Sequence, residues 1–569
     1  MVLHFGAVYY FNKDVKDLSL AECAYMAAIN HSPNAYNPFK EDEKKEKRIE
    51  NGHKRAKTVL GKMKELGSIN QEEYDSAIAQ INTGLVFSNG ETGATTLVSY
   101  QTEAALDQII NQMVEEKGLS KDIAEIKLYS GGYHIYTTQN TQIQGRLEQE
   151  LEKDKYLKTS PSKTQTTMAS MVIIEPKTGN VVAASAGIGA DKTHTYLGYF
   201  NYTTDLKKQT GSSIKPLAVI APGLETGKIT AATTFFDGES KFPGTKKNIH
   251  NEGAYSNANM TMRTAIAMSQ NVPNYKALSI IGVKPSVEFC QKIGLKEIKG
   301  DEGLSLALGG LTTGVSTMQM AAAYGMVAND GVYIEPVFYT KILDKDGNTF
   351  MEPKSVEDRS TRVMTESNAY IVKSLMKGVV ESPPGTGKYC AIPGIDVAAK
   401  TGTTDSHYDR WLCGFTNYYA GACWFGYGDK SETVTGFAVN PAGQIWSSVM
   451  KDIHSGLAPS TFAKPSNIVS AAVCLDTGMA ASDKCSNVYT EEFVSGTVPA
   501  VCNKHQAVKI CNDTGLLANE FCQNCSEKYF RVLSNEEVNG SWTVLNFGAE
   551  YTVPTEICTH TANDFTYED

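Results

Sequence analysis

The chain has 569 residues, which is too long for a single hydrophobic core, so about three or four folded units are expected. Its formal net charge of −10 argues against nucleic acid as the main partner. Because no run of about 18 apolar residues occurs, no segment of the sequence is expected to span a membrane.

Residues 1–85 are predicted to be helical. Ser19 and Glu22 stand at capping-box spacing ahead of an apolar run. Residues 46–67 alternate charged and apolar side chains at helical spacing. The basic residues there are interpreted as a solvated helix face, and a membrane-surface role is the alternative.

Residues 86–165 are interpreted as a linker that contains a helix near 98–116 and a short strand at 132–138. The pattern changes at residue 168, where two β-rich runs around Pro-Lys-Thr-Gly-Asn predict a hairpin. Strands separated by a helical middle predict one sheet between helices, in a domain spanning 166–457. Three further strands are predicted, at 396–404, 410–416 and 419–428.

The last segment, 458–569, is rich in cysteine. VCLDTGMAASDKC (473–485) recurs as ICNDTGLLANEFC (510–522), and each copy is predicted to be a small disulfide-closed unit. A zinc site resting on the Cys522–Cys525 pair is the less favoured alternative. An odd count also predicts one cysteine that is free or paired elsewhere. The seven cysteines are Cys474, Cys485, Cys502, Cys511, Cys522, Cys525 and Cys558.

Disulfides imply an oxidising compartment, yet the first residues, MVLHFGAVYYFNKD, have neither a basic leader nor a cleavage site typical of a signal peptide. This conflict predicts that an N-terminal piece is missing from the sequence.

The stretch GSSIKP contains a candidate nucleophile and base for serine acyl transfer. Ser212 and Lys215 are three residues apart and would share one face of a helix, whereas Ser213 would face away. Gly211 permits a tight turn into the helix, so Ser212 is expected near free backbone N–H groups that favour a developing anion. Because a lysine acts as a base only if burial or a nearby cation lowers its pKa, a second cation is expected close by.

Two further motifs supply the remaining groups. In MSQNVP, the Ser269 hydroxyl can relay a proton and the Asn271 amide can hold a substrate carbonyl. In KTGTT, Lys400 is the second cation, and a glycine would remove a side chain where a peptide-like substrate lies against a strand edge. The substrate-binding residues predicted here are Thr401, Gly402 and Thr403.

Each motif is common by chance, and each alone is interpreted as structural. Only Ser212, Ser269 and Lys400 occur in this order at domain-scale separations, each at a suitable element: a helix start, a loop and a strand. This combination is therefore interpreted as functional. The copies set aside begin at Ser160, Ser374, Ser448 and, for Lys-Thr-Gly, at Lys177.

The three motifs together resemble the signature of penicillin-binding proteins and class A β-lactamases. The surrounding stretches, such as QTGSSIKPLAVIAPGLE and DRWLCGFTNYYAGACWFGYGD, are similar to the transpeptidase domain of a class A penicillin-binding protein, and the resemblance runs from about residue 168 to 455. Two departures are Gln270, where the signature has aspartate, and Ala399, where the family usually has glycine.

Residues 9–39 and 55–63 are similar to the end of that family's lysozyme-like glycosyltransferase domain. The family's catalytic Glu-Asp pair, ahead of a Phe and a His, has no counterpart here. The expectation is a bifunctional synthase whose front part and membrane anchor lie upstream of Met1, so that this chain alone does not polymerise glycan strands.

The resemblance implies a multidomain α+β fold, with an antiparallel sheet flanked by helices after a partial, all-α lysozyme-like domain. It also implies that Ser212 attacks the D-Ala-D-Ala carbonyl of a peptidoglycan stem peptide and that Lys215 takes its proton. Ser269 and Lys400 then pass a proton to the leaving D-Ala, and an amine of a neighbouring stem resolves the acyl-enzyme. Lys400 and the two threonines bind the terminal carboxylate. No metal or organic cofactor is needed for this chemistry.

Three other functions stay open: a D,D-carboxypeptidase, a serine β-lactamase, and a non-catalytic sensor or scaffold that binds β-lactams or muropeptides. The expected partners are stem peptides, β-lactams, which acylate Ser212, and the cell-wall synthesis machinery. The expected location is the extracytoplasmic face of the bacterial cytoplasmic membrane.

Overall fold

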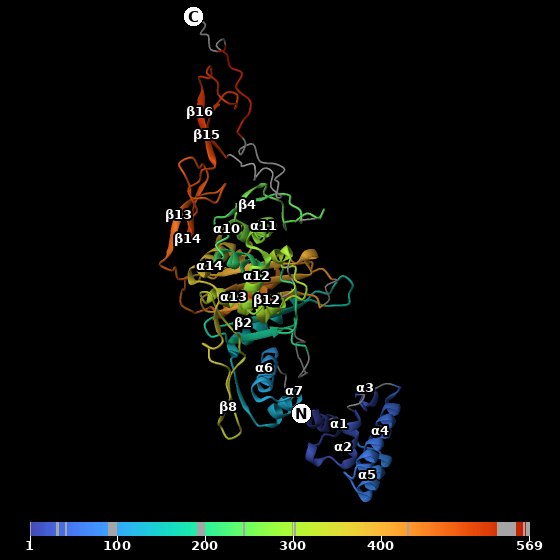
Figure 1. The fold of residues 1–569 in the computed structure, drawn as a ribbon. Coiled ribbons are helices and arrows are strands. Elements are labelled where there is room, and N and C mark those ends of the chain that lie inside the picture. Colours follow the sequence, from blue (N-terminus) through green and yellow to red (C-terminus); the bar gives the residue numbers. More distant parts are fainter. Residues whose placement is uncertain are drawn as a thin grey trace.

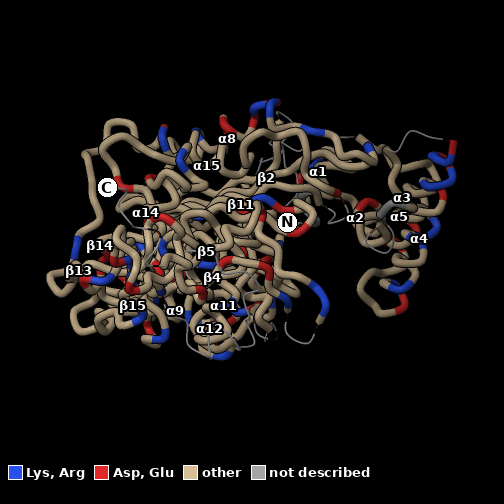
Figure 2. The backbone as a smooth tube through the Cα atoms, turned by 90° about the horizontal axis from the view of Figure 1, so that it is seen from above, with Lys and Arg blue, Asp and Glu red and all other residues tan. Residues whose placement is uncertain are grey.

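Helices make up the first unit of the chain, as predicted. The capping box forms, since the Glu22 N–H donates to Ser19 Oγ (3.2 Å) and the Ser19 N–H donates to Glu22 Oε2 (2.8 Å). Acidic and basic segments alternate along the outer helices (Figure 2), which agrees with a solvated face. The helices are α1 (Val2–Phe11), α2 (Leu20–Ile29), α3 (Pro33–Tyr36), α4 (Lys45–Glu65) and α5 (Gln71–Thr83).

This computed structural model places the helical unit to one side of a central body, from which the C-terminal tail extends (Figure 1). No helix among the described residues is long and apolar enough to cross a bilayer. The residues described are 2–29, 33–39, 43–88, 99–189, 200–242, 245–298, 300, 303–428, 432–531, 553–561 and 564.

A five-stranded antiparallel sheet with the order β10-β11-β12-β2-β3 forms the centre of the body. It confirms the predicted hairpin and the three later strands, and it joins them although more than 200 residues separate them. The strands are β2 (Met168–Ile174), β3 (Val181–Ala186), β10 (Ala398–Thr403), β11 (Asp409–Phe415) and β12 (Ala420–Gly426).

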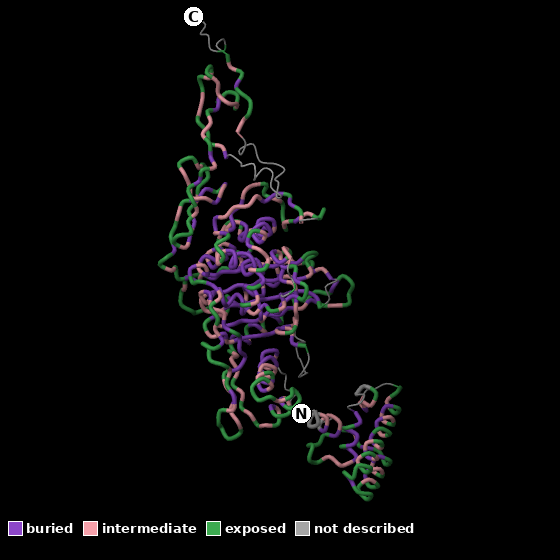
Figure 3. Tube along the Cα trace, viewed as in Figure 1, coloured by how far each residue is buried: buried purple, intermediate pink, exposed green. Residues whose placement is uncertain are grey.

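Both faces of this sheet are buried. Along β2, Val172 and Ile174 belong to one hydrophobic core, whereas Met171 and Ile173 belong to the other, because successive side chains of a strand point to opposite faces. Helix α13 (Thr317–Ala328) covers the first face, and α8 (Thr141–Leu151) with α15 (Pro441–Ile453) covers the second. The result is three layers, in which the buried residues concentrate (Figure 3).

The segment interpreted as a linker is folded onto this body. It contains α6 (Tyr100–Lys117), α7 (Lys121–Ser130), β1 (His134–Thr137) and α8, and β1 pairs with β7 (Tyr339–Leu343). It also covers the outer edge of β3: the Asn140 N–H donates to Val182 O (2.9 Å), and the Gln144 Nε2 donates to Ala184 O (3.1 Å). One edge of the central sheet is therefore closed by this segment.

Further helices and strands complete the body around the sheet. They are β4 (Thr234–Asp237), β5 (Ala258–Thr261), α10 (Met262–Ala267), α11 (Asn271–Ile281), α12 (Val283–Lys292), β6 (Val332–Ile334), β8 (Thr349–Met351), β9 (Ser360–Arg362) and α14 (Glu366–Glu381).

The tail consists of two hairpin modules in tandem. Module 1 contains β13 (Ile468–Cys474) and β14 (Val488–Val494), and module 2 contains β15 (His505–Cys511) and β16 (Cys525–Arg531). The predicted disulfide closure is wrong, because all 12 cysteines carry free thiols. Three thiols and a histidine gather in each module instead, and Cys525 lies outside both groups.

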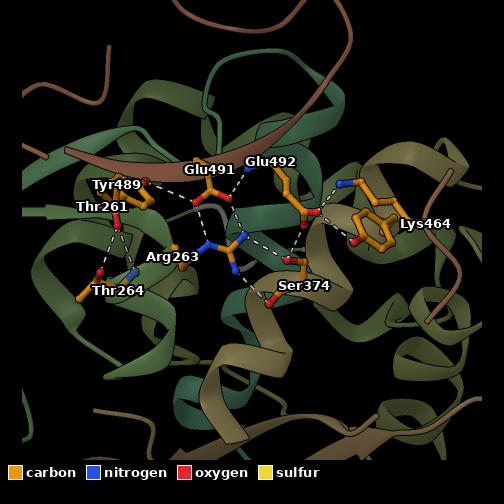
Figure 4. Close-up of polar contacts among 9 residues, drawn as sticks. Thr261, Arg263, Thr264, Ser374, Lys464, Tyr489, Glu491 and Glu492 are labelled. Atoms are coloured by element: carbon orange, nitrogen blue, oxygen red, sulfur yellow. Dashed lines mark hydrogen bonds and ion pairs between the residues drawn. The ribbon is translucent and has the colours of Figure 1, made fainter. Parts of the chain in front are cut away.

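Module 1 docks on the body through a buried carboxylate (Figure 4). Arg263 at the start of α10 donates to Glu491 of β14 from Nε (2.7 Å) and from Nη2 (2.6 Å). The neighbouring Glu492 bonds Lys464 at 2.7 Å. The Glu491 side chain is 1% exposed, so its charge depends on Arg263 as a partner.

Candidate active site

The predicted nucleophile lies on an irregular helix start that packs directly on strand β10. Residues Gly211–Ile214 form one turn of 3₁₀-helix (η3), Pro216–Ile220 form a π-helical turn (η4), and α9 (Ala221–Glu225) follows. Gly211 has φ +51°, and a Cβ there would lie 2.2 Å from Thr403 O. Glycine is therefore required at 211 because backbone meets backbone.

Gly402 has a different structural reason from the one predicted. A Cβ at this position would lie 2.4 Å from Thr210 O and 3.0 Å from the Cβ of Ser213. The missing side chain thus makes room for the helix start that carries the nucleophile. The sequence pattern indicated that a side chain is excluded here but not which neighbour excludes it.

The two adjacent serines have different environments. Ser213 is fully buried, and its Oγ donates to Thr210 O at 2.9 Å, so its hydroxyl serves the local fold. Tyr324 also donates to Ser213 O (2.6 Å). Ser212 is only partly buried. Of the two hydroxyls, the one at 212 is the one that a ligand can reach.

Lys215 is fully buried and joins the first motif to the second. Its Nζ donates to Ser269 O (2.7 Å), Gln270 O (3.1 Å) and Asn271 Oδ1 (2.7 Å). Burial, followed by the charge of Lys400, holds the pKa of Lys215 well below its usual range. A lowered pKa favours the neutral amine, which is the form that the predicted role of Lys215 as a base requires.

Lys400 of β10 is the predicted second cation. Its Nζ donates to Ser269 Oγ (2.7 Å) and to Thr401 O (2.9 Å), and burial lowers its pKa to about 7. Ser269 lies in the loop between α10 and α11 with φ +61°, a left-handed conformation that non-glycine residues adopt only when their surroundings impose it. The structure therefore brings all three motifs together, with Ser269 between the two lysines.

A cavity of about 480 Å³ lies beside the predicted substrate-binding residues of β10. Thr401 and Thr403 line it, and the Arg410 Nη1 donates to Thr403 Oγ1 (3.2 Å). Strand β10 is the edge strand of the sheet, so an extended ligand can pair with it.

Arg410 and Thr386 are among the lining residues of this cavity that were not predicted as site residues. The Oγ1 atoms of Thr386 and Thr401 lie 3.0 Å apart. Thr386 belongs to the Gly-Thr-Gly stretch at 385–387, which was the available signal for it.

The motif copies that were set aside serve the fold. On α14, Ser374 accepts from Arg263, and Lys377 pairs with Asp396 (2.7 Å). On α15, the Ser448 Oγ donates to Glu150 Oε2 (2.6 Å). The remaining two copies lie in the loop before β2 and at the β2–β3 turn.

Three family models match successive parts of the chain. The model described as "Transglycosylase" matches residues 3–64. The model described as "Penicillin binding protein transpeptidase domain" matches residues 169–443. The model described as "Penicillin-binding protein 1A, C-terminal domain" matches residues 464–507.

Curated relatives of the chain are named penicillin-binding protein 1A. The chain is 33% identical to penicillin-binding protein 1A of Clostridium botulinum strain Hall over 513 residues, which cover 86% of this chain and 60% of that protein. It is 31% identical to penicillin-binding protein 1A of Clostridium perfringens strain 13, covering 78% and 68%. The chain thus spans about three fifths of the length of the first of these relatives.

Solved structures share the fold. The chain is similar to penicillin-binding protein 1A from Haemophilus influenzae, with a TM-score of 0.58 and 20% identity, over 87% of this chain and 88% of that one. It is also similar to the penicillin-binding protein PonA1 from Mycobacterium tuberculosis, with a TM-score of 0.54 and 21% identity, over 64% and 95%.

Proposed function

Because this chain belongs to the class A penicillin-binding proteins, we propose that it is a peptidoglycan D,D-transpeptidase that forms its acyl-enzyme on Ser212. The observation that carries this proposal is the convergence of two buried lysines on Ser269, next to a partly exposed serine at a helix start.

In the first step, Ser212 Oγ attacks the carbonyl carbon of the penultimate D-Ala, and its proton goes to Lys215. The C–N bond to the terminal D-Ala then breaks, and the leaving amine takes a proton through Ser269, whose hydroxyl is held by Lys400. In the second step, the amine of a neighbouring stem attacks the ester, loses a proton to the same relay and releases Ser212. A β-lactam enters the first step as a substrate mimic.

The donor stem peptide lies along the free edge of β10, and its terminal carboxylate contacts Lys400, Thr401 and Thr403. Arg410 donates to Thr403 and forms an ion pair with Glu252 (3.8 Å), so it holds Thr403 in place beside the carboxylate. Asn271 holds a substrate carbonyl, and it is positioned by the Lys215 hydrogen bond that its Oδ1 accepts.

Glycan polymerisation is not part of the proposed activity of this chain. Among the described residues of the first unit, Glu22 is the buried acidic side chain, and it is engaged by Lys13 (2.8 Å) and by the Ser19 N–H. Such a carboxylate supports the helix start and is not poised as a general acid. An assay of glycan-chain synthesis with this chain tests the proposal, and chain growth above the background would contradict it.

We place the site on the extracytoplasmic face of a bacterial membrane, together with the cell-wall synthesis machinery, because its substrate is cross-linked there. Fractionation of the cells that naturally produce the protein, with detection by fluorescent penicillin, tests this placement, and a protein confined to the cytoplasm would contradict it.

The nucleophile is tested with a fluorescent penicillin and mass spectrometry of the labelled peptide. Ser212→Ala should abolish labelling, whereas Ser213→Ala, which removes a buried structural hydroxyl, should leave label on Ser212. Label on Ser213, or undiminished labelling of Ser212→Ala, would exclude the assigned nucleophile.

The acceptor distinguishes the remaining functions. With a donor stem peptide and an acceptor amine, a transpeptidase forms the cross-linked product. A carboxypeptidase releases D-Ala without that product, a β-lactamase turns over the penicillin, and a sensor stops at the acyl-enzyme.

A further inference from the structure

Each tail module gathers three thiols and one imidazole at a single point. In module 1 the group is Cys474, Cys485, Cys502 and His505, and in module 2 it is Cys511, Cys522, Cys558 and His560. Within each group, one potential ligand atom from every side chain lies within 4.8 Å of all the others. The first sulfur of each group is buried, and so is the third.

The two groups rest on the same backbone framework. The first cysteine is the last residue of a strand, and it leads into a tight turn in which Gly478 or Gly515 adopts positive φ (69° and 73°). The glycine N–H donates to the carbonyl of that cysteine at 2.8 Å in both modules. The same turn therefore positions the sulfur of Cys474 in module 1 and the sulfur of Cys511 in module 2.

The second cysteine is held by a second turn. Its backbone N–H donates to the carbonyl three residues earlier at 3.2 Å in both modules. Its sulfur accepts a backbone N–H from Ser482 in module 1 and from Asn519 in module 2, at 3.4 Å each. Backbone donors to sulfur favour the thiolate form, which is the form that binds metals.

The third cysteine arrives from a more distant segment. Isolated parallel bridges join Ala480 to Val501 and Leu517 to Ile557, one residue before Cys502 and Cys558 respectively. These two cysteines donate their N–H groups to Ala480 O (2.7 Å) and Leu517 O (2.8 Å). The two modules therefore share the same backbone structure around the third cysteine, although the sequences that carry Cys502 and Cys558 lie outside the repeated stretches.

The histidine completes each group. The His505 Nδ1 lies 3.4 Å from Cys502 Sγ and 3.7 Å from Cys485 Sγ, and its Nε2 lies 3.1 Å from Asp476 Oδ2. A carboxylate on the far nitrogen is the usual support of a metal-bound imidazole. In module 2 the His560 Nδ1 lies 3.6 Å from Cys511 Sγ.

We propose that each group binds one Zn²⁺ ion through three thiolates and the histidine Nδ1. With Zn–S bonds of about 2.3 Å, the ligand atoms of a tetrahedral site are about 3.8 Å apart, which matches the separations seen here. Four protein ligands leave no open position, so both sites are structural. The sequence led to an expectation of no metal and favoured disulfides in the tail, and the zinc alternative considered there rested on the Cys522–Cys525 pair, so the proposed sites differ from both expectations.

A metal accounts for features that disulfides do not. Three thiols around one histidine would leave one sulfur unpaired in each module, whereas one metal ion engages all three. The hydrophobic cluster under module 1 has three buried members, Val473, Phe493 and Ala232 of the body, which is too small a core to hold a fold by itself. The seventh cysteine, Cys525, pairs across the hairpin with Cys511 at the position that Val488 occupies in module 1, so it is outside the ligand set.

The test is the metal content and the thiol state of the whole chain, purified without chelator. Elemental analysis should find two zinc ions per chain, one for each group. Cys485→Ser and Cys522→Ser should each remove one, and the double variant should remove both. Cys525→Ser is the matched control, because it deletes a cysteine next to Cys522 but outside the group, and it should retain both ions.

Cobalt provides a second readout that does not depend on the variants. The wild-type chain reconstituted with Co²⁺ should show visible d–d bands of a tetrahedral site and thiolate-to-metal charge transfer. Labelling by fluorescent penicillin checks that the body of each variant is folded.

Three outcomes would overturn the proposal. They are a metal-free chain whose mass under non-reducing conditions shows disulfides within the groups, iron instead of zinc, and loss of an ion in Cys525→Ser equal to that in Cys522→Ser.

Discussion

The acyl-transfer site and the tail modules both collect reactive side chains from distant segments, but they hold them in opposite ways. Lys215 and Lys400 are fully buried lysines kept near each other by the two large cores on either side of the sheet. The tail thiols are held by short hairpins with few buried residues. The comparison teaches that a large core can preorganise groups that repel, whereas a small module needs a ligand to do so.

The largest expected effect is on acylation in the body, and it comes from a substitution that does not alter the tail. Lys215→Met removes the proposed base, and the rate of acylation by fluorescent penicillin should fall by about 10²–10⁴-fold. Lys373→Met is the matched control, because Lys373 is also a buried lysine but contacts Ala328 and Asp330 elsewhere in the body. A comparable loss in the control would mean that any buried lysine is needed for folding.

The second prediction concerns a treatment that should unfold the tail modules without affecting the body. Removing zinc with a chelator should speed proteolysis within residues 473–531 by about 10²-fold, because metal binding and folding of such modules are one equilibrium. Acylation of Ser212 should persist at nearly the same rate. Equal protection of the tail with and without chelator would show that its hairpins need no ligand.

The third prediction sharpens the electrostatic side of the comparison. Lys215 must be neutral to accept a proton, so acylation is lost as the pH falls through its lowered pKa. Lys400 must be charged to bind a carboxylate, so acylation is also lost as the pH rises through about 7, by about tenfold per unit.

Lys400→Arg separates the two limbs of this profile. Because arginine stays charged, the loss at high pH should disappear while the loss at low pH remains. An unchanged alkaline limb in Lys400→Arg would assign it to another group.

The smallest expected effect concerns the contact between the two regions. Arg263→Ala leaves the buried Glu491 without its partner, and amide exchange in β14 should accelerate by about tenfold. Lys464→Ala is the control, since its pair with Glu492 is more exposed and contributes little. Acylation should change less than threefold in both variants, and a larger loss in Arg263→Ala would show that the docking contact also shapes α10.

The strands and the three motifs could be predicted from the sequence because each has a local signature: alternation for the strands, and fixed spacing for Ser212, Ser269 and Lys400. The π-helical turn at Pro216–Ile220 and the role of Gly402 could not, since they depend on which backbone lies opposite. Arg410 and Thr386 were missed for the same reason, because tertiary packing brings them to the cavity.

The tail was misinterpreted because its ligands do not have the short spacing of common zinc motifs. The pair Cys522–Cys525 has that spacing, yet only Cys522 points into the group. The signal that was available is a histidine two or three residues after the third cysteine, at His505 and at His560. Both histidines lie outside the repeated stretches 473–485 and 510–522, so a comparison of the two repeats does not reveal them.

The closed edge of the central sheet has a consequence for how copies of this protein meet. An open edge strand is a template for pairing with another chain, and a sheet with two open edges can add copies on both sides without end. Here the segment that carries α8 covers β3, and among the described residues no backbone group pairs with the outer edge of β10. If two copies met through β10, each would use the open edge of its central sheet, and that sheet could add no third copy.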